Sequence, residues 1–222
     1  MVMFVRMIAE KAEEWGEEVW AASLDLEKAF DKVYHTSVID ALQEAGIEPD
    51  VIQFLWQCYK QQSAYVSLHA NAQGRLFQIL RGVRQGDPLS PALFNNVTRR
   101  VYADLKERWS RKGFGTRVCG GATFNFTHAM FADDVTLFAA NRQQLLSMIR
   151  DVRDELAKHG LNLNMDKCQV QTNRPNAPIV PIKLDGADIP MVPPEVGFKL
   201  LGTQFTLTGR CSTELRLRVA VA

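Results

Sequence analysis

The sequence is poor in the residues that build metal or disulfide scaffolds. Its 222 residues include four cysteines, Cys58, Cys119, Cys168 and Cys211, each more than forty positions from the next. The four histidines form no pair at ligand spacing. Structural zinc and disulfide frameworks both need such residues in close pairs. We therefore expect neither, and we expect reduced thiols in an intracellular protein.

Long hydrophobic runs and a strong net charge are also lacking. The apolar residues Met1 to Val5 are interrupted by Arg6, far short of a signal peptide core or of the roughly 20 residues that a membrane helix needs. We expect no membrane association. The formal charge is +1, which argues against a basic tail that binds nucleic acid.

The charges are nevertheless unevenly distributed. Residues 1–50 contain 12 acidic and 4 basic residues, whereas residues 75–117 contain 10 basic and 3 acidic residues. A polyanion would be attracted to the second segment. The hydrophobic pattern predicts helices alternating with short strands, in the order β, α, α, β, β, α, β, β, α, β, which is typical of an α+β fold of the split βαβ, ferredoxin-like kind. Trp20, Trp56 and Trp109 lie in apolar periodic settings, and we expect them in the core.

Carboxylates stand at two expected strand ends. The apolar run Val19–Leu24 predicts a strand that stops at Asp25, and two further strands, 126–131 and 135–139, would be joined through Ala132, Asp133 and Asp134. Adjacent carboxylates repel and lose solvation unless cations gather them. Three carboxylates at strand ends could hold two hard divalent ions. The alternative is that each aspartate caps a turn.

Five segments resemble motifs of one enzyme family. Residues 24–31 (LDLEKAFD) resemble motif A of reverse transcriptases, especially those of non-LTR retrotransposons. In chain order, residues 81–91 resemble motif B, 131–134 motif C, 160–167 motif D, and 198–202 motif E, the primer grip. The resemblance implies an α+β polymerase palm with a ferredoxin-like split βαβ core and an antiparallel sheet packed on helices.

The resemblance also assigns metal ligands. It implies that Asp25 and Asp133 hold two Mg²⁺ ions, with Mn²⁺ as the alternative ion and the Leu26 carbonyl as a further ligand. Asp134 would be a supporting carboxylate. Strand alternation agrees with this ranking, because neighbouring side chains point to opposite faces and only one of the pair can aim at Asp25.

Further residues correspond to family positions that handle substrate. Phe30 matches a wall against the 2′-hydroxyl of the incoming nucleotide, and Lys167 matches a proton donor to pyrophosphate. The alternatives are a core phenylalanine and a surface lysine. Arg84, Gln85 and Gly86 are expected at the nucleotide pocket. The alternatives are a solvated charge for Arg84 and a simple turn for Gln85 and Gly86. Leu201 and Gly202 are expected at the primer grip.

The function expected from the resemblance is an RNA-directed DNA polymerase with an RNA template, a DNA primer and dNTPs as partners. The alternative is a catalytically inactive palm remnant that binds only nucleic acid or a partner protein. An RNA polymerase on the same palm is disfavoured by Phe30. We expect residues 1–206 to form the palm, with the fingers largely missing, and residues 207–222 to begin a truncated connection or thumb. Nuclear action follows from the resemblance alone, and nothing in the sequence indicates the oligomeric state.

Overall fold

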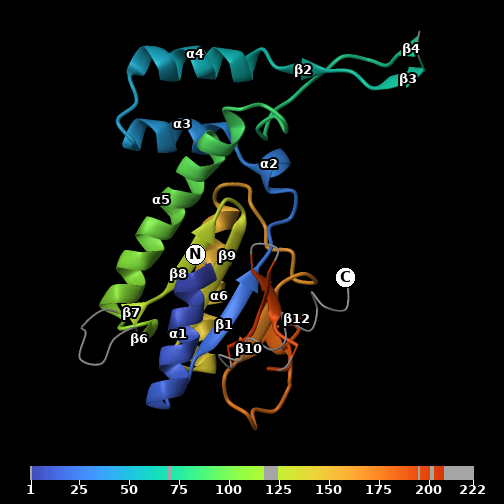
Figure 1. Cartoon of the computed structure of the whole chain (residues 1–222). Helices are drawn as coiled ribbons and strands as arrows, with labels where there is room; N and C mark the ends of the chain where they lie inside the picture. The colour runs from blue at the N-terminus through green and yellow to red at the C-terminus, as the bar shows by residue number, and fades with distance from the viewer. Residues whose placement is uncertain (1, 70–71, 118–124, 195, 201–202, 208–222) are drawn as a thin grey trace. The chain divides into compact units, whose positions relative to one another are not determined.

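The computed structural model describes residues 2–69, 72–117, 125–194, 196–200 and 203–207 (Figure 1). The chain divides into two compact units. Unit 1 comprises Met1–Leu26, Ala103–Asp154 and Asn162–Ala222, and unit 2 comprises Glu27–Tyr102 and Glu155–Leu161. Each unit is described by itself.

Unit 1 contains the main sheet of the described residues and the helices that cover it. The helix α5 (Ser90–Arg111) contributes its C-terminal half to this unit. The other elements are α1 (Val2–Trp15), β1 (Trp20–Leu24), β6 (Thr116–Arg117), β7 (Asn125–Phe126), β8 (His128–Phe131), β9 (Asp134–Ala139), α6 (Arg142–Ala157), β10 (Gln169–Thr172), β11 (Ile182–Leu184), β12 (Ala187–Ile189), β13 (Phe198–Leu200) and β14 (Thr203–Phe205).

The main sheet has four strands in the order β10-β1-β9-β8. All neighbouring strands are antiparallel, with Ala22 of β1 opposite both Leu137 of β9 and Val170 of β10. Four of the five β1 residues are buried, as a central strand covered on both faces requires. The end of β1 and the start of β9 therefore lie side by side at the same end of the sheet, because Leu24 pairs with Val135.

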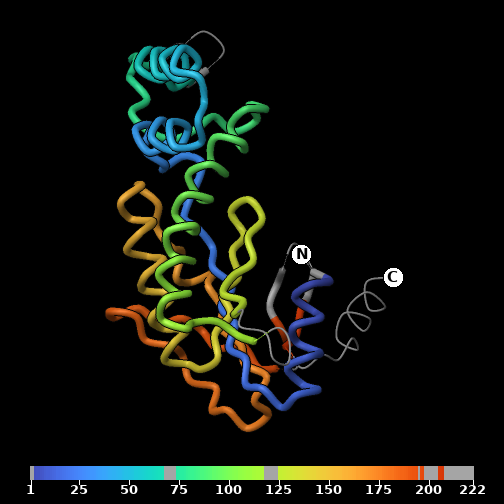
Figure 2. Tube along the Cα trace, turned by 90° about the vertical axis from the view of Figure 1, so that its left-hand side faces the viewer, coloured from blue at the N-terminus to red at the C-terminus, as the bar shows by residue number. Residues whose placement is uncertain are grey.

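Helices cover both faces of this sheet. In the two views α1 lies on one side of the sheet and α6 on the other (Figures 1 and 2). Val5, Ala9 and Ala12 of α1 form a buried cluster with Ala21 of β1 and Phe138 of β9. At about 25 cal/mol per Å² of apolar surface removed from water, this burial is the main contribution to the stability of the layered arrangement.

The helix α6 follows directly from the sequence pattern. Leu145, Met148, Ile149 and Val152 recur at helical spacing and are all fully buried. The Asn141 side chain accepts a hydrogen bond of 2.8 Å from the backbone N–H of Gln144, which caps the first turn. The Trp109 indole of α5 donates a 2.9 Å hydrogen bond to Asp151 of α6, so these two helices are joined within unit 1.

Unit 2 consists of short helices, small two-stranded ribbons and the N-terminal half of α5. Its helices α3 and α4 are antiparallel neighbours joined by a short turn that contains Gly46 (Figure 1). The elements are α2 (Ala29–Lys32), α3 (His35–Glu44), α4 (Pro49–Lys60), β2 (Ser63–Ala64), β3 (Ser67–His69), β4 (Ala72–Gln73) and β5 (Phe77–Gln78).

The expected long helix and the strands that end at Asp25 and begin after Ala132 are confirmed. Two expectations are wrong in detail. Asp134 is the first residue of β9 rather than part of the turn, because it pairs with Phe131. Trp20 and Trp109 are buried, but Trp56 is only half-buried, because it faces a pocket instead of a core.

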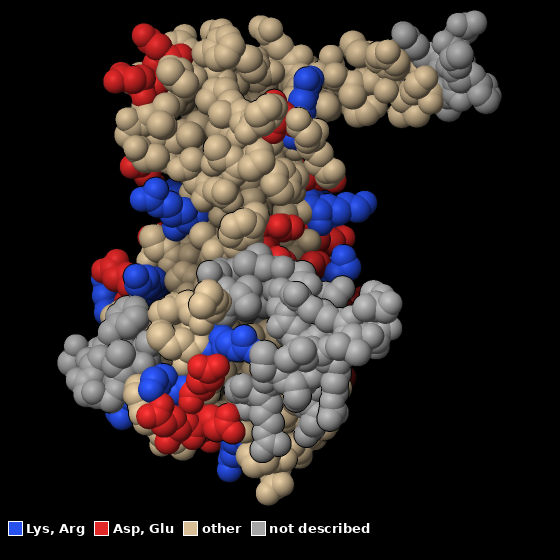
Figure 3. All heavy atoms as spheres, in the orientation of Figure 1, with Lys and Arg blue, Asp and Glu red and all other residues tan. Residues whose placement is uncertain are grey.

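Charge is grouped on the surface. Acidic side chains gather over the C-terminal end of α1, where Glu10, Glu13 and Glu14 are exposed (Figure 3). No helix within the described ranges combines the length and the apolar character needed to cross a bilayer.

Candidate active site

The backbone of Asp25 is fixed by the segment that precedes β10. The Asn164 N–H donates a 2.8 Å hydrogen bond to the Asp25 carbonyl oxygen. The Cys168 thiol accepts from the Asp25 N–H at 3.5 Å and contacts the Asp25 carbonyl oxygen at 3.9 Å. Leu26, the next residue, forms an isolated antiparallel bridge with Leu163. Motifs A and D are thus held together by backbone hydrogen bonds in unit 1.

Asp133 is displayed by a tight hairpin turn. Ala132 and Asp133 form the two-residue loop between β8 and β9, because Phe131 pairs with Asp134. Ala132 has a φ of 54°, in the left-handed region that residues with a Cβ rarely adopt. A positive φ at the first loop residue is what a two-residue hairpin of type II′ requires. Strain of this kind tends to be kept at functional sites.

The three aspartates are close enough to interact electrostatically. Leu24 of β1 pairs with Val135 of β9, and Asp25 and Asp134 are the chain neighbours of these two paired residues. Burial raises the pKa of Asp134, and the charges of Asp133 and Asp25 raise it further. Like charges brought together at the end of a sheet are stabilised by a cation.

A protein cation already contacts this cluster. Lys167 Nζ lies 3.7 Å from an Asp25 carboxylate oxygen. The donor set is three carboxylates and a carbonyl, which suits a hard divalent ion, and the Lys167 ammonium stands where such an ion would neutralise charge. In the part of the chain that the structure describes, no three His, Cys, Asp or Glu side chains converge tightly enough to hold a metal. A metal held by these carboxylates would therefore require their side chains to move closer together.

In unit 2, motif B is tied to the segment that carries Phe30. The Val83 N–H donates a 2.7 Å hydrogen bond to the Phe30 carbonyl oxygen, and the Gln85 amide donates a 3.0 Å hydrogen bond to Asp31. The half-buried Phe30 ring stacks on Phe94 of α5, with centroids 4.9 Å apart and planes at 21°. Phe30 and Gln85 are therefore brought close together.

Of the remaining expected residues, two lie on the surface of unit 2 and two fall outside the described ranges. Arg84 and Gly86 are exposed, and Gly86 has a φ of 85° with open space around its Cα. Leu201 and Gly202 lie outside the described residues; the strands on either side of them, β13 and β14, are antiparallel.

Basic residues of segment 75–117 are partly neutralised by neighbouring carboxylates. Arg100 binds Glu44 at 2.8 Å, and Lys112 lies 3.7 Å from Asp151. The charge available to a polyanion is therefore smaller than the residue count suggests.

Sequence reasoning missed Cys168 as a contact of Asp25. The two residues are 143 positions apart, Cys168 lies one residue beyond motif D, and no spacing rule links them. Only the pairing of β1 with β10 brings them together.

The fold resembles that of solved telomerases. Apo telomerase from Candida tropicalis aligns with 85% of this chain at a TM-score of 0.58 and 15% sequence identity, over 34% of its own length. Telomerase from Candida albicans, solved in complex with a TWJ fragment of telomeric RNA, aligns with 99% of this chain at a TM-score of 0.55 and 13% identity, over 36% of its own length. The class defined by this fold is thus a mixed helix–strand fold with an antiparallel sheet, similar to part of these telomerase structures.

Residues 3–205 match the family model described as "Reverse transcriptase (RNA-dependent DNA polymerase)". The chain belongs to the reverse transcriptase family, which confirms the resemblance seen in motifs A to E.

Relatives among curated proteins come from non-LTR elements. The Retrovirus-related Pol polyprotein from type-2 retrotransposable element R2DM of Drosophila melanogaster is 32% identical over 93% of this chain. The Retrovirus-related Pol polyprotein from type-1 retrotransposable element R2 of Nasonia vitripennis is 32% identical over 75%. The chain spans 19% and 15% of these two polyproteins.

Proposed function

We propose that this chain carries the palm of an RNA-directed DNA polymerase, which adds deoxynucleotides from dNTPs to the 3′-hydroxyl of a DNA primer on an RNA template. The observation that carries the proposal is the meeting of Asp25 with Asp133 and Asp134 at one edge of an antiparallel sheet, in a chain of the reverse transcriptase family.

The strand order supports a palm with a split βαβ core. β1 and β8 are both antiparallel to β9, which lies between them, so β1 and β8 run parallel with one strand inserted. This is the arrangement that defines a split βαβ unit. We assign residues 1–206 to the palm and residues 207–222 to the start of a connection or thumb.

Asp25 and Asp133, with the Leu26 carbonyl, would hold two Mg²⁺ ions, and Asp134 would support them; Mn²⁺ is the alternative. Bound there, the metals supply charge neutralisation at the attacking and leaving oxygens of phosphoryl transfer. For this, Lys167 must release Asp25, which its 3.7 Å separation and exposed side chain allow.

The reaction would form a bond between the primer 3′ oxygen and the α-phosphorus while the bond to pyrophosphate breaks, and the proton of the 3′-hydroxyl would pass to solvent. The residues of this chain would position the reactants and move one proton. Lys167 would donate a proton to the departing pyrophosphate. Phe30 would block a 2′-hydroxyl, and the Gln85–Gly86 loop would let the backbone approach the new base pair closely. Leu201 and Gly202 would position the primer end.

Primer extension tests the proposal. The chain is incubated with Mg²⁺, dNTPs and a DNA primer annealed to an RNA template, beside its Asp133→Ala, Asp134→Ala double variant. We expect incorporation that the double variant lacks. Incorporation that is equal in both proteins would contradict the assigned site.

The alternative, a remnant that binds nucleic acid without turnover, makes a different prediction. It requires that both proteins bind the primer–template equally and that neither extends it. Calorimetric titration with Mg²⁺ then compares the parent chain with the double variant. If the carboxylates form a metal site, the parent chain gives a heat of binding that the double variant lacks.

A further inference from the structure

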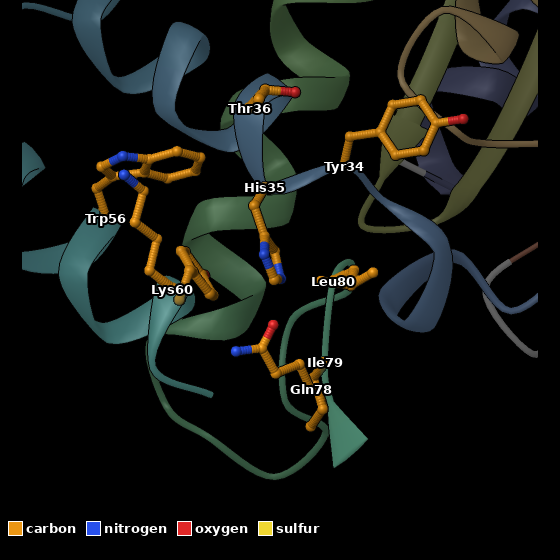
Figure 4. Close-up of a pocket in the computed structure, with 9 residues that line it drawn as sticks. Tyr34, His35, Thr36, Trp56, Lys60, Gln78, Ile79 and Leu80 are labelled. Carbon is orange, nitrogen blue, oxygen red and sulfur yellow. The ribbon is translucent and has the colours of Figure 1, made fainter. Parts of the chain in front are cut away.

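Unit 2 contains a pocket of about 290 Å³ that none of the five motifs accounts for. It lies between α3, α4 and the residues that follow β5 (Figure 4). The Gln78 side chain points toward the His35 ring and the Lys60 side chain extends toward Trp56, whereas the Tyr34 ring and the Thr36 hydroxyl point away (Figure 4).

The walls of the pocket are held by hydrogen bonds to the backbone. The Ile79 N–H donates to the Gln62 carbonyl oxygen at 3.0 Å, which ties the β5 side to the end of α4. His35 Nε2 lies 2.9 Å from the Gly82 carbonyl oxygen. Since a carbonyl can only accept, Nε2 carries the proton and donates it. The pocket is therefore largely preformed.

Flat aromatic surfaces line the pocket. The buried His35 and Tyr59 rings stack on each other, with centroids 4.3 Å apart and planes at 19°. The half-buried Trp56 carries the Lys60 ammonium 5.1 Å from its ring centroid. Planar rings beside a cation are the elements that single-stranded nucleic acid sites combine, because every base has a face that can stack.

The polar groups of the pocket complement a nucleotide as well. The Gln78 amide offers a donor and an acceptor to the edge of a base, and Lys60 offers a charge to a phosphate. No carboxylate is among the lining residues. The neighbouring groove, lined by Ile39, Ile47 and Ile52, lacks a cation and does not share this character.

The pocket is continuous with motif B. Gln78, Ile79 and Leu80 run directly into Arg81 and Gly82, and Arg81 bridges Tyr34 at the pocket rim. The Gly82 N–H donates a 2.7 Å hydrogen bond to the Val33 carbonyl oxygen. A strand that passes motif B would therefore pass the pocket mouth.

We propose that this pocket binds the base of an unpaired nucleotide, stacked on Trp56 and contacted by Gln78 and Lys60. The inference rests on the proposed function, in that the chain handles a nucleic acid strand. It adds to that function a site for a nucleotide outside the template–primer duplex. The same chemistry could come from a free nucleotide.

Photocrosslinking without any catalytic step tests the site. A 12-nucleotide RNA with one 5-iodouridine is bound to the chain and irradiated, and the crosslinked residue is located by mass spectrometry. We expect the crosslink at Trp56 or Tyr59. The Asp133→Ala, Asp134→Ala variant should crosslink equally, so failure of the polymerase proposal would leave this result intact.

Matched variants then measure the contribution of the pocket. Trp56→Ala should weaken binding of the RNA about tenfold, the effect of losing one base–aromatic stack, and Trp56→Phe should restore most of it. Phe54→Ala, an exposed residue of the same helix that does not line the pocket, is the control and should bind normally. Gln78→Ala, at an exposed position, gives a second test that spares the core of unit 2.

The outcomes are decisive. Competition by UMP for the same crosslink would support the pocket and identify a free nucleotide as the source, whereas competition by RNA alone would identify a strand. Crosslinks only at other residues, or equal binding by Trp56→Ala and Phe54→Ala, would overturn the proposal. So would the absence of any crosslink.

Discussion

The Cys168 thiol contacts both backbone polar groups of Asp25, at 3.5 Å from its nitrogen and 3.9 Å from its carbonyl oxygen. Cys168 is fully buried, and burial raises the pKa of its thiol to about 11, so it is a neutral hydrogen-bonding group. We interpret it as a positioning residue for Asp25, the proposed metal ligand.

Replacing Cys168 should therefore loosen Asp25. We expect Cys168→Ala to weaken Mg²⁺ binding, measured by calorimetry, and to slow primer extension by roughly tenfold, because misplaced catalytic groups are costly. Cys168→Ser, which keeps a donor and an acceptor, should retain more activity. Cys58→Ala, at an exposed free cysteine, is the control. Loss of stability without any change in Mg²⁺ affinity would leave Cys168 a packing residue only.

The adjacent aspartates should not be equivalent. Asp134 begins β9 and burial raises its pKa, so its ionised form is disfavoured relative to a solvated carboxylate. Asp133, in the turn, is the principal ligand in the proposed site. We expect Asp133→Ala to abolish primer extension and Asp134→Ala to reduce it less. Equal rates in the two single variants at saturating Mg²⁺ would contradict this ranking.

Phe30 should select the sugar of the incoming nucleotide. Its ring stacks on Phe94, so Phe30→Ala removes both a wall and a packing contact. We expect ribonucleotide incorporation to rise relative to dNTP use, because without the bulky ring an apolar pocket would reject an added hydroxyl only about 10²-fold. Phe94→Leu disturbs the stack but keeps Phe30, and it should preserve sugar preference. If both variants changed the preference alike, packing would explain the effect.

Local sequence patterns predicted the parts of the fold that depend on local chemistry. The strand before Asp25, the helix from Ser90 and the hairpin at Asp133 were each confirmed, since their hydrophobic periods and turn residues lie within a few positions. The strand pattern singled out the three carboxylates, and the motif resemblance identified the family and assigned each carboxylate its expected role.

Contacts between distant segments could not be predicted in this way. The contact of Cys168 with Asp25 depends on the register of β10, and the pocket around Trp56 depends on how Gln78 returns to α4. Trp56 occupies an apolar helical period and was expected in the core. Its partial exposure arises because α4 packs on few neighbours within unit 2, so one face of the helix borders a cavity.

Two glycines of motif B should differ in their tolerance of alanine. Gly82 and Gly86 both have φ near 90°, so alanine costs about 1 kcal/mol at either position. At Gly82 an added Cβ would also lie 2.7 Å from the Asp31 carbonyl oxygen, whereas Gly86 has open space. Urea unfolding should therefore show Gly82→Ala to be less stable than Gly86→Ala by at least another 1 kcal/mol or so. If the two variants lost the same free energy of unfolding, the Asp31 backbone would have to move away from the added Cβ at little cost.

His128 should make unit 1 sensitive to acid. Its ring lies edge-on to Trp109, and burial, with the charge of Lys106, lowers its pKa from 6.5 to about 4. Between these values the unfolded chain binds a proton that the folded chain does not, so the stability contributed by neutral His128 is present above pH 6.5 and is lost as the pH falls towards 4. At pH 5 the loss is about 2 kcal/mol.

His128→Phe keeps a ring against Trp109 and removes the titration. The free energy of unfolding in urea, measured at pH 7 and at pH 5, should fall by about 2 kcal/mol less in this variant than in the parent chain. Because the value at pH 5 is subtracted from the value at pH 7 within each protein, any pH-independent effect of the substitution on packing cancels. His35 and His159, whose pKa values are also lowered by burial, contribute equally to both proteins. An unchanged pH dependence would show that His128 gains its proton without opening unit 1, and the acid sensitivity would then belong to those two histidines of unit 2.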